Sequence, residues 1–218
     1  MSIGYEPKLA DQHVRCVLTI NAELRLAVSS DPAWSFVLDS KGAQVQQFEE
    51  PADRIGETGA GPLLQDIDGD GTPELLVVTD IGGTGGEPMA VWRLTAPPLF
   101  VRAGEIFGFR RFYQTPEGFF GNYAHSSAAS GVVTLYQWVD NKLVEVALLD
   151  VQVSGRENAP GDDHDWVLNG NTECRLSTAD YPPGAREARM AALRAAGIDP
   201  ATAAQRFCTQ PWVATIYR

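Results

Sequence analysis

The segment DIDGDGTPELLVV, residues 66–78, constrains the local structure more than any other stretch of the chain. Asp66, Asp68 and Asp70 stand at alternate positions, and Gly71 and Glu74 follow them. Four carboxylates within nine residues repel one another unless a cation lies among them. A hard cation such as Ca²⁺ takes about six to eight oxygen ligands, which alternate acidic residues on a tight loop can supply. The segment therefore predicts a cation-binding loop that leads directly into a strand.

Gly71 is the sixth residue counted from Asp66, where calcium loops turn sharply and need a positive φ. An EF-hand is excluded, because its loop ends in a Glu at the twelfth position between two helices, and Val77 occupies that position here. The alternative to a cation site is an acidic surface turn before a strand. The predicted Ca²⁺ ligands are four carboxylates and one backbone carbonyl, those of Asp66, Asp68, Asp70, Glu74 and Thr72.

Short segments of alternating apolar and polar residues, separated by Gly, Asn and Asp turns, fill most of the chain. They predict hairpins over 13–29, 35–48 and 131–147, the last with its turn at Asp140–Asn141. Many short strands at this spacing are typical of a sandwich, a barrel or a propeller. Single strands are predicted at 74–79, 89–95, 98–102, 109–114, 117–123, 148–154 and 212–217.

A helical segment is predicted near the C-terminus. Residues 185–197, AREARMAALRAAG, are rich in Ala and Arg and end at a glycine, as a helix commonly does. Asp199–Pro200 then gives an N-cap and a first-turn proline for a short second helix to about Phe207. We therefore expect one all-β domain over residues 1–218 with a helical appendage at about 184–207.

The chain has three cysteines, so at least one thiol is unpaired within it. Cys174 and Cys208 bracket the helical segment, and a disulfide between them would hold that segment against the rest of the fold. This pairing is our prediction, and it implies an oxidising compartment. Zinc-type and redox CxxC motifs are absent from the sequence.

The net charge of −11 argues against nucleic-acid binding, which requires a basic face. Residues 174–218 hold six Arg and three acidic residues, so they carry +3 and the remaining chain carries −14. An acidic body favours association with a basic partner, although solubility alone would also explain it. The sequence has no apolar run near 18 residues, so no membrane span is expected.

The Asp-rich loop followed by a strand resembles the FG-GAP or VCBS calcium-binding repeat of integrin-α-type β-propellers. A wider region, about 63–155, resembles the propeller-like immunity proteins of Xanthomonas-type type IV secretion systems. The likeness is carried by DIDGDGTPELLVVTDIGGTGGEPMAVWRL, by PPLFV and by SGVVTLYQWVDNKLVEV. It implies a β-propeller-like fold, a periplasmic location and the binding of a secreted lysozyme-like effector.

Lysozyme inhibitors commonly insert a loop with Ser and Tyr into the substrate cleft, so the resemblance directs attention to GNYAHSSAASG, residues 121–131. The Gly-rich segment 80–88, with Gly83 and Thr84, is the second candidate. The alternative for 121–131 is an ordinary hairpin loop whose aromatic side chains pack in the core. The first partner-binding candidates are Tyr123, His125, Ser126 and Ser130.

Two other classes of function are weighed against the inhibitor. One is an FG-GAP-type adhesion or carbohydrate-binding module. The other is a metal-dependent hydrolase that uses the acidic cluster at 162–165, which contains His164. His125 beside Ser126 is a poor nucleophile–base pair, since adjacent side chains rarely reach that geometry and no GxSxG motif is present. We expect no catalysis.

Overall fold

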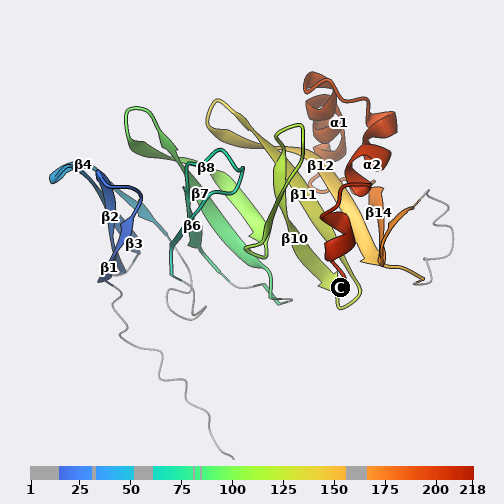
Figure 1. The fold of residues 1–218 in the computed structure, drawn as a ribbon, viewed down its shortest axis with the longest axis horizontal. Coiled ribbons are helices and arrows are strands. Elements are labelled where there is room, and N and C mark those ends of the chain that lie inside the picture. Colours follow the sequence, from blue (N-terminus) through green and yellow to red (C-terminus); the bar gives the residue numbers. More distant parts are fainter. Residues whose placement is uncertain (1–14, 31–32, 52–60, 81, 84, 156–165) are drawn as a thin grey trace, which may run out of the picture. The chain divides into compact units, whose positions relative to one another are not determined.

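The computed structural model of the chain describes residues 15–30, 33–51, 61–80, 82–83, 85–155 and 166–218. Within them, strands β1–β14 form three largely antiparallel sheets, and two short helices follow near the C-terminus (Figure 1). The expected fold class, all-β with a short C-terminal helical segment, is confirmed.

Contacts between Cα atoms group the chain into two compact units, which are described separately. Residues 1–65, 72–81 and 87–106 make up the first unit. Residues 66–71, 82–86 and 107–218 make up the second. The single domain expected over 1–218 stays a prediction.

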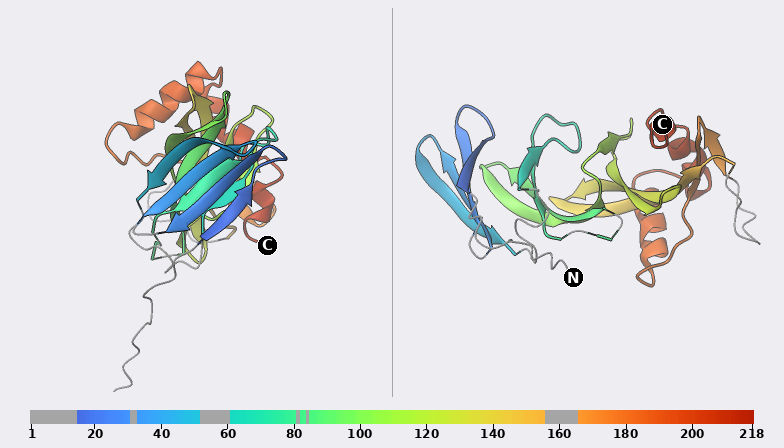
Figure 2. Two further views of the ribbon diagram at one scale, coloured as in Figure 1. Left: turned by 90° about the vertical axis from the view of Figure 1, so that its left-hand side faces the viewer. Right: turned by 90° about the horizontal axis from the view of Figure 1, so that it is seen from below.

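The first unit is built on two four-stranded meanders, because each strand returns beside the one before it (Figure 2). Alternate residues of β2 and β3, Leu26, Phe36 and Leu38 among them, pack with Leu75 and Trp92 in one core. Four-stranded meanders are the form of propeller blades, and a propeller-like arrangement stays our interpretation. The strands are β1 (Arg15–Thr19), β2 (Leu24–Ser30), β3 (Trp34–Ser40), β4 (Ala43–Glu50), β5 (Leu63–Gln65), β6 (Glu74–Val78), β7 (Glu87–Thr95) and β8 (Leu99–Gly108).

The second unit holds a six-stranded sheet in the order β13-β14-β12-β11-β10-β9. Its central hairpin is β11–β12, and Asp140 and Asn141 at the turn have φ values of 49° and 61°. Such left-handed pairs are what a two-residue hairpin turn requires. The strands are β9 (Phe112–Gln114), β10 (Phe120–Ser127), β11 (Ser130–Val139), β12 (Lys142–Val153), β13 (Val167–Asn169) and β14 (Thr172–Leu176).

The helices α1 (Ala185–Ala195) and α2 (Pro200–Cys208) pack against β12 and β14 (Figure 1). The Asp199 carboxylate accepts a hydrogen bond from the Ala201 N–H, which is the N-cap expected before Pro200. A disulfide joins Cys174 on β14 to Cys208 at the end of α2, the two cysteines paired in the sequence analysis. No helix in the described part of the chain is long and apolar enough to cross a membrane.

Several expected element bounds are wrong. The stretch 212–217 is not a strand, because Val213–Thr215 form a short 3₁₀ helix and Trp212 stacks on the Tyr113 ring at 4.8 Å. The strand expected at 148–154 is the second half of β12, which continues through a bulge at Val146, opposite Leu135 and Tyr136 of β11. Tertiary packing decides both cases, since neither is visible in local periodicity. The sequence analysis did not predict the short strands β5, β13 and β14.

Candidate functional site

The acidic segment forms the connection between the paired strands β5 and β6. The Asp66 carboxylate accepts hydrogen bonds from the N–H groups of Gly69 at 2.7 Å and Gly71 at 3.0 Å. The Asp68 carboxylate accepts one from the Asp70 N–H at 3.0 Å. Gly69 and Gly71 have φ values of 81° and 89°, which only glycine adopts without strain. The backbone therefore folds around the acidic side chains, as the sequence analysis expected.

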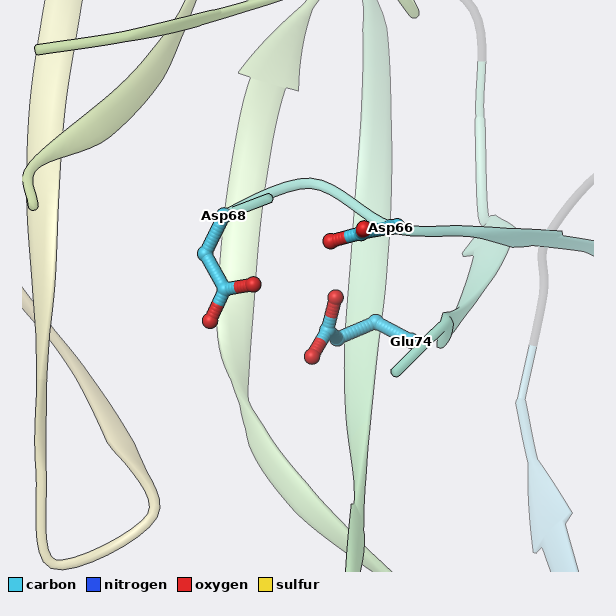
Figure 3. A group of neighbouring side chains, drawn as sticks. All are labelled: Asp66, Asp68 and Glu74. Atoms are coloured by element: carbon cyan, nitrogen blue, oxygen red, sulfur yellow. The ribbon is translucent and has the colours of Figure 1, made fainter. Parts of the chain in front are cut away.

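Three carboxylates of this segment converge. One oxygen each from Asp66, Asp68 and Glu74 lie within 4.8 Å of one another, and their side chains point toward a common space (Figure 3). Oxygens that coordinate Ca²⁺ at about 2.3–2.6 Å lie at most about 5 Å apart, so this spacing fits one shared cation. Glu74 is only 1% exposed, so its carboxylate reaches the group from the buried start of β6. The group can hold a divalent cation, and the spacing does not select Ca²⁺.

The other two predicted ligands are placed differently. Asp70 is exposed and does not join the group of three carboxylates. Thr72 is half-buried and would contribute a backbone carbonyl, as predicted. The structure therefore brings together three of the four predicted carboxylates.

A residue far along the chain also contacts the acidic segment. The Trp138 indole N–H on β11 donates a hydrogen bond of 2.5 Å to the Asp68 carboxylate. The Gln114 amide on β9 donates one of 3.4 Å to the Ile67 carbonyl. Sequence spacing gives no indication of this partner, because Trp138 and Asp68 lie 70 residues apart. Bonds of this kind orient the ligands of metal sites.

The expected loop at 121–131 is mostly strand. β10 continues to Ser127 and β11 begins at Ser130, so only two residues connect them. Gly121 pairs with Leu135, and Gly131 pairs with His125, in the ladder of β10 and β11. A Cβ at either glycine would come within 2.3 Å of a carbonyl oxygen on the opposite strand. Close approach of the two backbones therefore requires these glycines, which in the sequence resembled loop residues.

Tyr123 packs in the core rather than on a loop, and its side chain is 7% exposed. Its hydroxyl is hydrogen-bonded to the Tyr217 hydroxyl at 2.7 Å and to His125 Nδ1 at 3.0 Å. Burial raises the pKa of Tyr123, and the hydrogen bond with Tyr217 opposes that rise. Tyr123 thus stays a protonated phenol near neutral pH, and it supports His125 from within the sheet.

The three other candidates on this hairpin lie nearer the surface. His125 is half-buried, and its ring meets the Phe109 ring edge-to-face at 4.9 Å. Ser126 is exposed, whereas the Ser130 hydroxyl is hydrogen-bonded to that of Ser127 at 2.7 Å. Ser126 is the candidate most accessible to a partner.

The Gly-rich segment forms a closed turn. The Gly82 N–H donates to the Gly86 carbonyl at 2.7 Å, and the Gly85 N–H donates to the Gly82 carbonyl at 3.0 Å. Gly83 is exposed on this turn, and Thr84 lies outside the described residues. The turn packs under the Phe107 ring, because a Cβ at Gly86 would lie 2.7 Å from its Cζ atom.

The structure brings the two candidate segments into one surface. Phe107 covers Gly82 and Gly86, and a Cβ at Gly85 would lie 3.9 Å from the Phe109 ring. Phe109 in turn contacts His125. We call this surface the aromatic strip, defined by Gly82, Gly85, Gly86, Phe107, Phe109 and His125.

Phe107 and Phe109 were not among the sequence-predicted site residues. Phe107 and Phe109 are separated in the sequence by one residue, Gly108. Two residues at this spacing lie on one face of a strand. That signal was present, but nothing local connects it to glycines more than 20 residues earlier.

Comparisons with known proteins give one structural likeness. No family model matches the chain, and no curated protein matches it. The chain is similar to a solved structure described as "Structure of a Xanthomonas Type IV Secretion System related protein", with a TM-score of 0.45 and 13% sequence identity. The match covers 76% of this chain and 94% of that one. The resemblance to the FG-GAP or VCBS repeat gains no support from these comparisons and stays a prediction.

The residues of the alternative hydrolase centre, Asp162, Asp163, His164 and Asp165, lie outside the described residues. Among the described residues the one histidine is His125, and its Nδ1 atom lies 3.0 Å from the Tyr123 hydroxyl and 3.0 Å from the Ser127 carbonyl oxygen. Its neighbour Ser126 is exposed on the strand.

Proposed function

We propose that this chain is a periplasmic immunity protein that binds and blocks a secreted, lysozyme-like, peptidoglycan-degrading effector. The proposal includes no catalysis by the chain itself. Inhibition would come from occlusion of the substrate cleft of the effector by the aromatic strip and the adjacent end of the β10–β11 hairpin.

The observation that carries the proposal is the junction of two separately predicted segments. The Gly-rich turn and the β10–β11 hairpin share contacts with Phe107 and Phe109 in one surface. A binding surface of this kind combines apolar rings with nearby hydrogen-bonding groups, here His125 and exposed Ser126. Aromatic anchors with polar neighbours are typical of protein interfaces.

Charge supports the same class of partner. The net charge of −11 would attract a basic enzyme over long range and raise the association rate. The aromatic strip itself contains no carboxylate, so it would not repel the two catalytic carboxylates that glycan-cleaving enzymes carry. The exposed Ser126 hydroxyl would offer a hydrogen-bond donor to those carboxylates.

The carboxylates of Asp66, Asp68 and Glu74 are assigned a structural role in this proposal. We propose that they hold Ca²⁺, which neutralises the acidic segment and fixes the start of β6. A cation that binds only the folded chain stabilises it by mass action.

The test is binding and inhibition of a muramidase or amidase encoded beside this gene. Calorimetry should give a 1:1 complex, and stoichiometric addition should stop the enzyme from clearing a cell-wall suspension. If no cell-wall hydrolase binds at micromolar concentration, the proposal fails. Binding of glycans alone would favour the adhesion or carbohydrate-binding module instead.

A further inference from the structure

Phe107 is a partly exposed aromatic side chain at the surface of the second unit. It lies near the end of β8 and is 43% exposed, although most large apolar side chains of the described chain are buried. Its ring lies against the Gly-rich turn. A Cβ at Gly82 would lie 3.0 Å from its Cε2 atom, and a Cβ at Gly86 2.7 Å from its Cζ atom.

The turn holds the ring in place. Its two internal hydrogen bonds, from Gly82 and from Gly85, close it beneath the ring. At the next residue, Gly108, a Cβ would lie 2.5 Å from the Tyr123 carbonyl oxygen, so the backbone there packs directly against β10. The Asn122 amide adds hydrogen bonds to the carbonyls of Phe107 at 3.2 Å and Phe109 at 3.1 Å. An aromatic side chain fixed in this way loses little entropy when a partner covers it.

Two further rings belong to the aromatic strip. A Cβ at Gly85 would lie 3.9 Å from the Phe109 ring, and His125 meets Phe109 edge-to-face at 4.9 Å. Ser126, the next residue on β10, is exposed. The strip therefore carries an apolar ring, Phe107, together with the His125 imidazole, and exposed Ser126 follows His125 along β10.

We propose that Phe107 is the anchor of the inhibitory surface and that it occupies a sugar-ring subsite in the cleft of a peptidoglycan hydrolase. This inference rests on the proposed function and names the contact that carries it. A glycan-cleaving cleft is concave, is lined largely by apolar and aromatic groups, and holds flat sugar rings beside two carboxylates. A flat, rigid phenyl ring fits that shape, and the exposed Ser126 hydroxyl supplies a donor for the carboxylates.

Charge argues for this occupant over an acidic one. The chain carries −11 overall, which favours a basic enzyme at long range. The strip carries no carboxylate, which permits close approach to the acidic centre of a cleft. Both features fit a basic protein with a carboxylate-containing cleft.

The experiment measures the affinity of the muramidase encoded beside this gene for wild-type chain and for Phe107→Ala, Phe107→Tyr and Tyr181→Ala. Phe107→Ala should weaken binding by about 30-fold or more, as removal of an interface anchor does. Phe107→Tyr, which keeps the ring, should bind within about threefold of wild type. Tyr181 is 88% exposed outside the strip, and its replacement should leave affinity unchanged. Thermal melting of each variant separates lost binding from lost folding.

A second arm adds a tetrasaccharide of N-acetylglucosamine, which fills the enzyme cleft, and should displace the wild-type chain. If Phe107→Ala folds and binds like wild type, the anchor inference is overturned while the proposed function stands. Failure of the tetrasaccharide to compete would also overturn it, because binding would then lie outside the cleft. Binding of the tetrasaccharide to the chain itself would make the ring a carbohydrate platform and overturn it too. If the wild-type chain binds no hydrolase, the proposed function fails, and the inference fails with it.

Discussion

The acidic segment and the aromatic strip are both candidate sites, and they are assembled in opposite ways. The carboxylates of Asp66, Asp68 and Glu74 come from nine consecutive residues. The strip takes its members from a turn at 82–86, from the end of β8 and from β10. The first is a local object that a few hydrogen bonds define, and the second exists only after three segments have come together. The sequence alone therefore indicates the acidic segment, whereas it does not indicate the aromatic strip.

The two sites should also respond differently to substitution. Loss of a carboxylate in the acidic segment should act through the cation, so its effect should depend on added Ca²⁺. Loss of a contact in the strip should act through packing, so its effect should be the same with or without Ca²⁺. Substitutions in the two sites test this difference.

Asp66→Ala should produce the largest change. It removes one predicted ligand and the acceptor for the Gly69 and Gly71 N–H groups. At a Ca²⁺ concentration about 100 times the Kd, the wild type should gain about 2.7 kcal/mol, and the variant should gain none of it. Thermal melting with and without Ca²⁺ gives the measurement.

Asp66→Asn is the matched control, because it keeps an acceptor oxygen and loses the charge. It can accept from only one of the Gly69 and Gly71 N–H groups, so in chelator it should melt between Asp66→Ala and wild type, and it should still show no Ca²⁺ response. An equal response to Ca²⁺ in both variants and in wild type would show that the segment holds no cation.

Gly86→Ala should have an intermediate effect on stability. A Cβ there would lie 2.7 Å from the Phe107 ring, so the ring or the turn must shift, at a cost of about 1–3 kcal/mol. Gly83→Ala, in the same turn, meets nothing within 4 Å and should stay within about 0.5 kcal/mol of wild type. Urea unfolding compares the two, and equal stability would mean that Phe107 does not rest on the turn.

Much of the fold followed from local pattern, and so did the acidic segment. Alternation predicted the hairpins of β1–β4 and β11–β12, and Asp140–Asn141 marked a turn that needs left-handed residues. Gly69, Gly71 and the alternating acids specify the loop within one short stretch. These features are local because each hydrogen bond that defines them joins residues a few positions apart.

The rest depended on contacts that no local pattern records. Gly121 and Gly131 resembled loop residues, because a glycine needed for close approach of two strands looks the same in sequence as one needed for a turn. Trp212 is typical of a strand residue, yet stacking on Tyr113 places it before a 3₁₀ helix. The strip was missed for the same reason, since Phe107 gains its meaning only from glycines elsewhere in the chain.

Trp138→Phe should have the smallest effect and would show how far the acidic segment is truly local. It removes the indole donor to Asp68 while keeping an aromatic ring against Phe120. Loss of such an orienting bond typically weakens metal affinity by about tenfold or more. Calcium titration of the melting temperature should therefore shift its midpoint upward. An unchanged midpoint would mean that residues 66–74 alone set the affinity. The acidic segment would then be a fully local site, unlike the aromatic strip.

The disulfide between Cys174 and Cys208 has a further consequence for the intact molecule. It encloses the segment that contains both helices, with 34 residues of sequence separation between the bonded cysteines. A protease that cuts the backbone once inside this segment leaves two fragments that are still covalently joined. Such a cut would therefore leave the C-terminal piece attached, and this piece includes the Tyr217 whose hydroxyl is hydrogen-bonded to Tyr123.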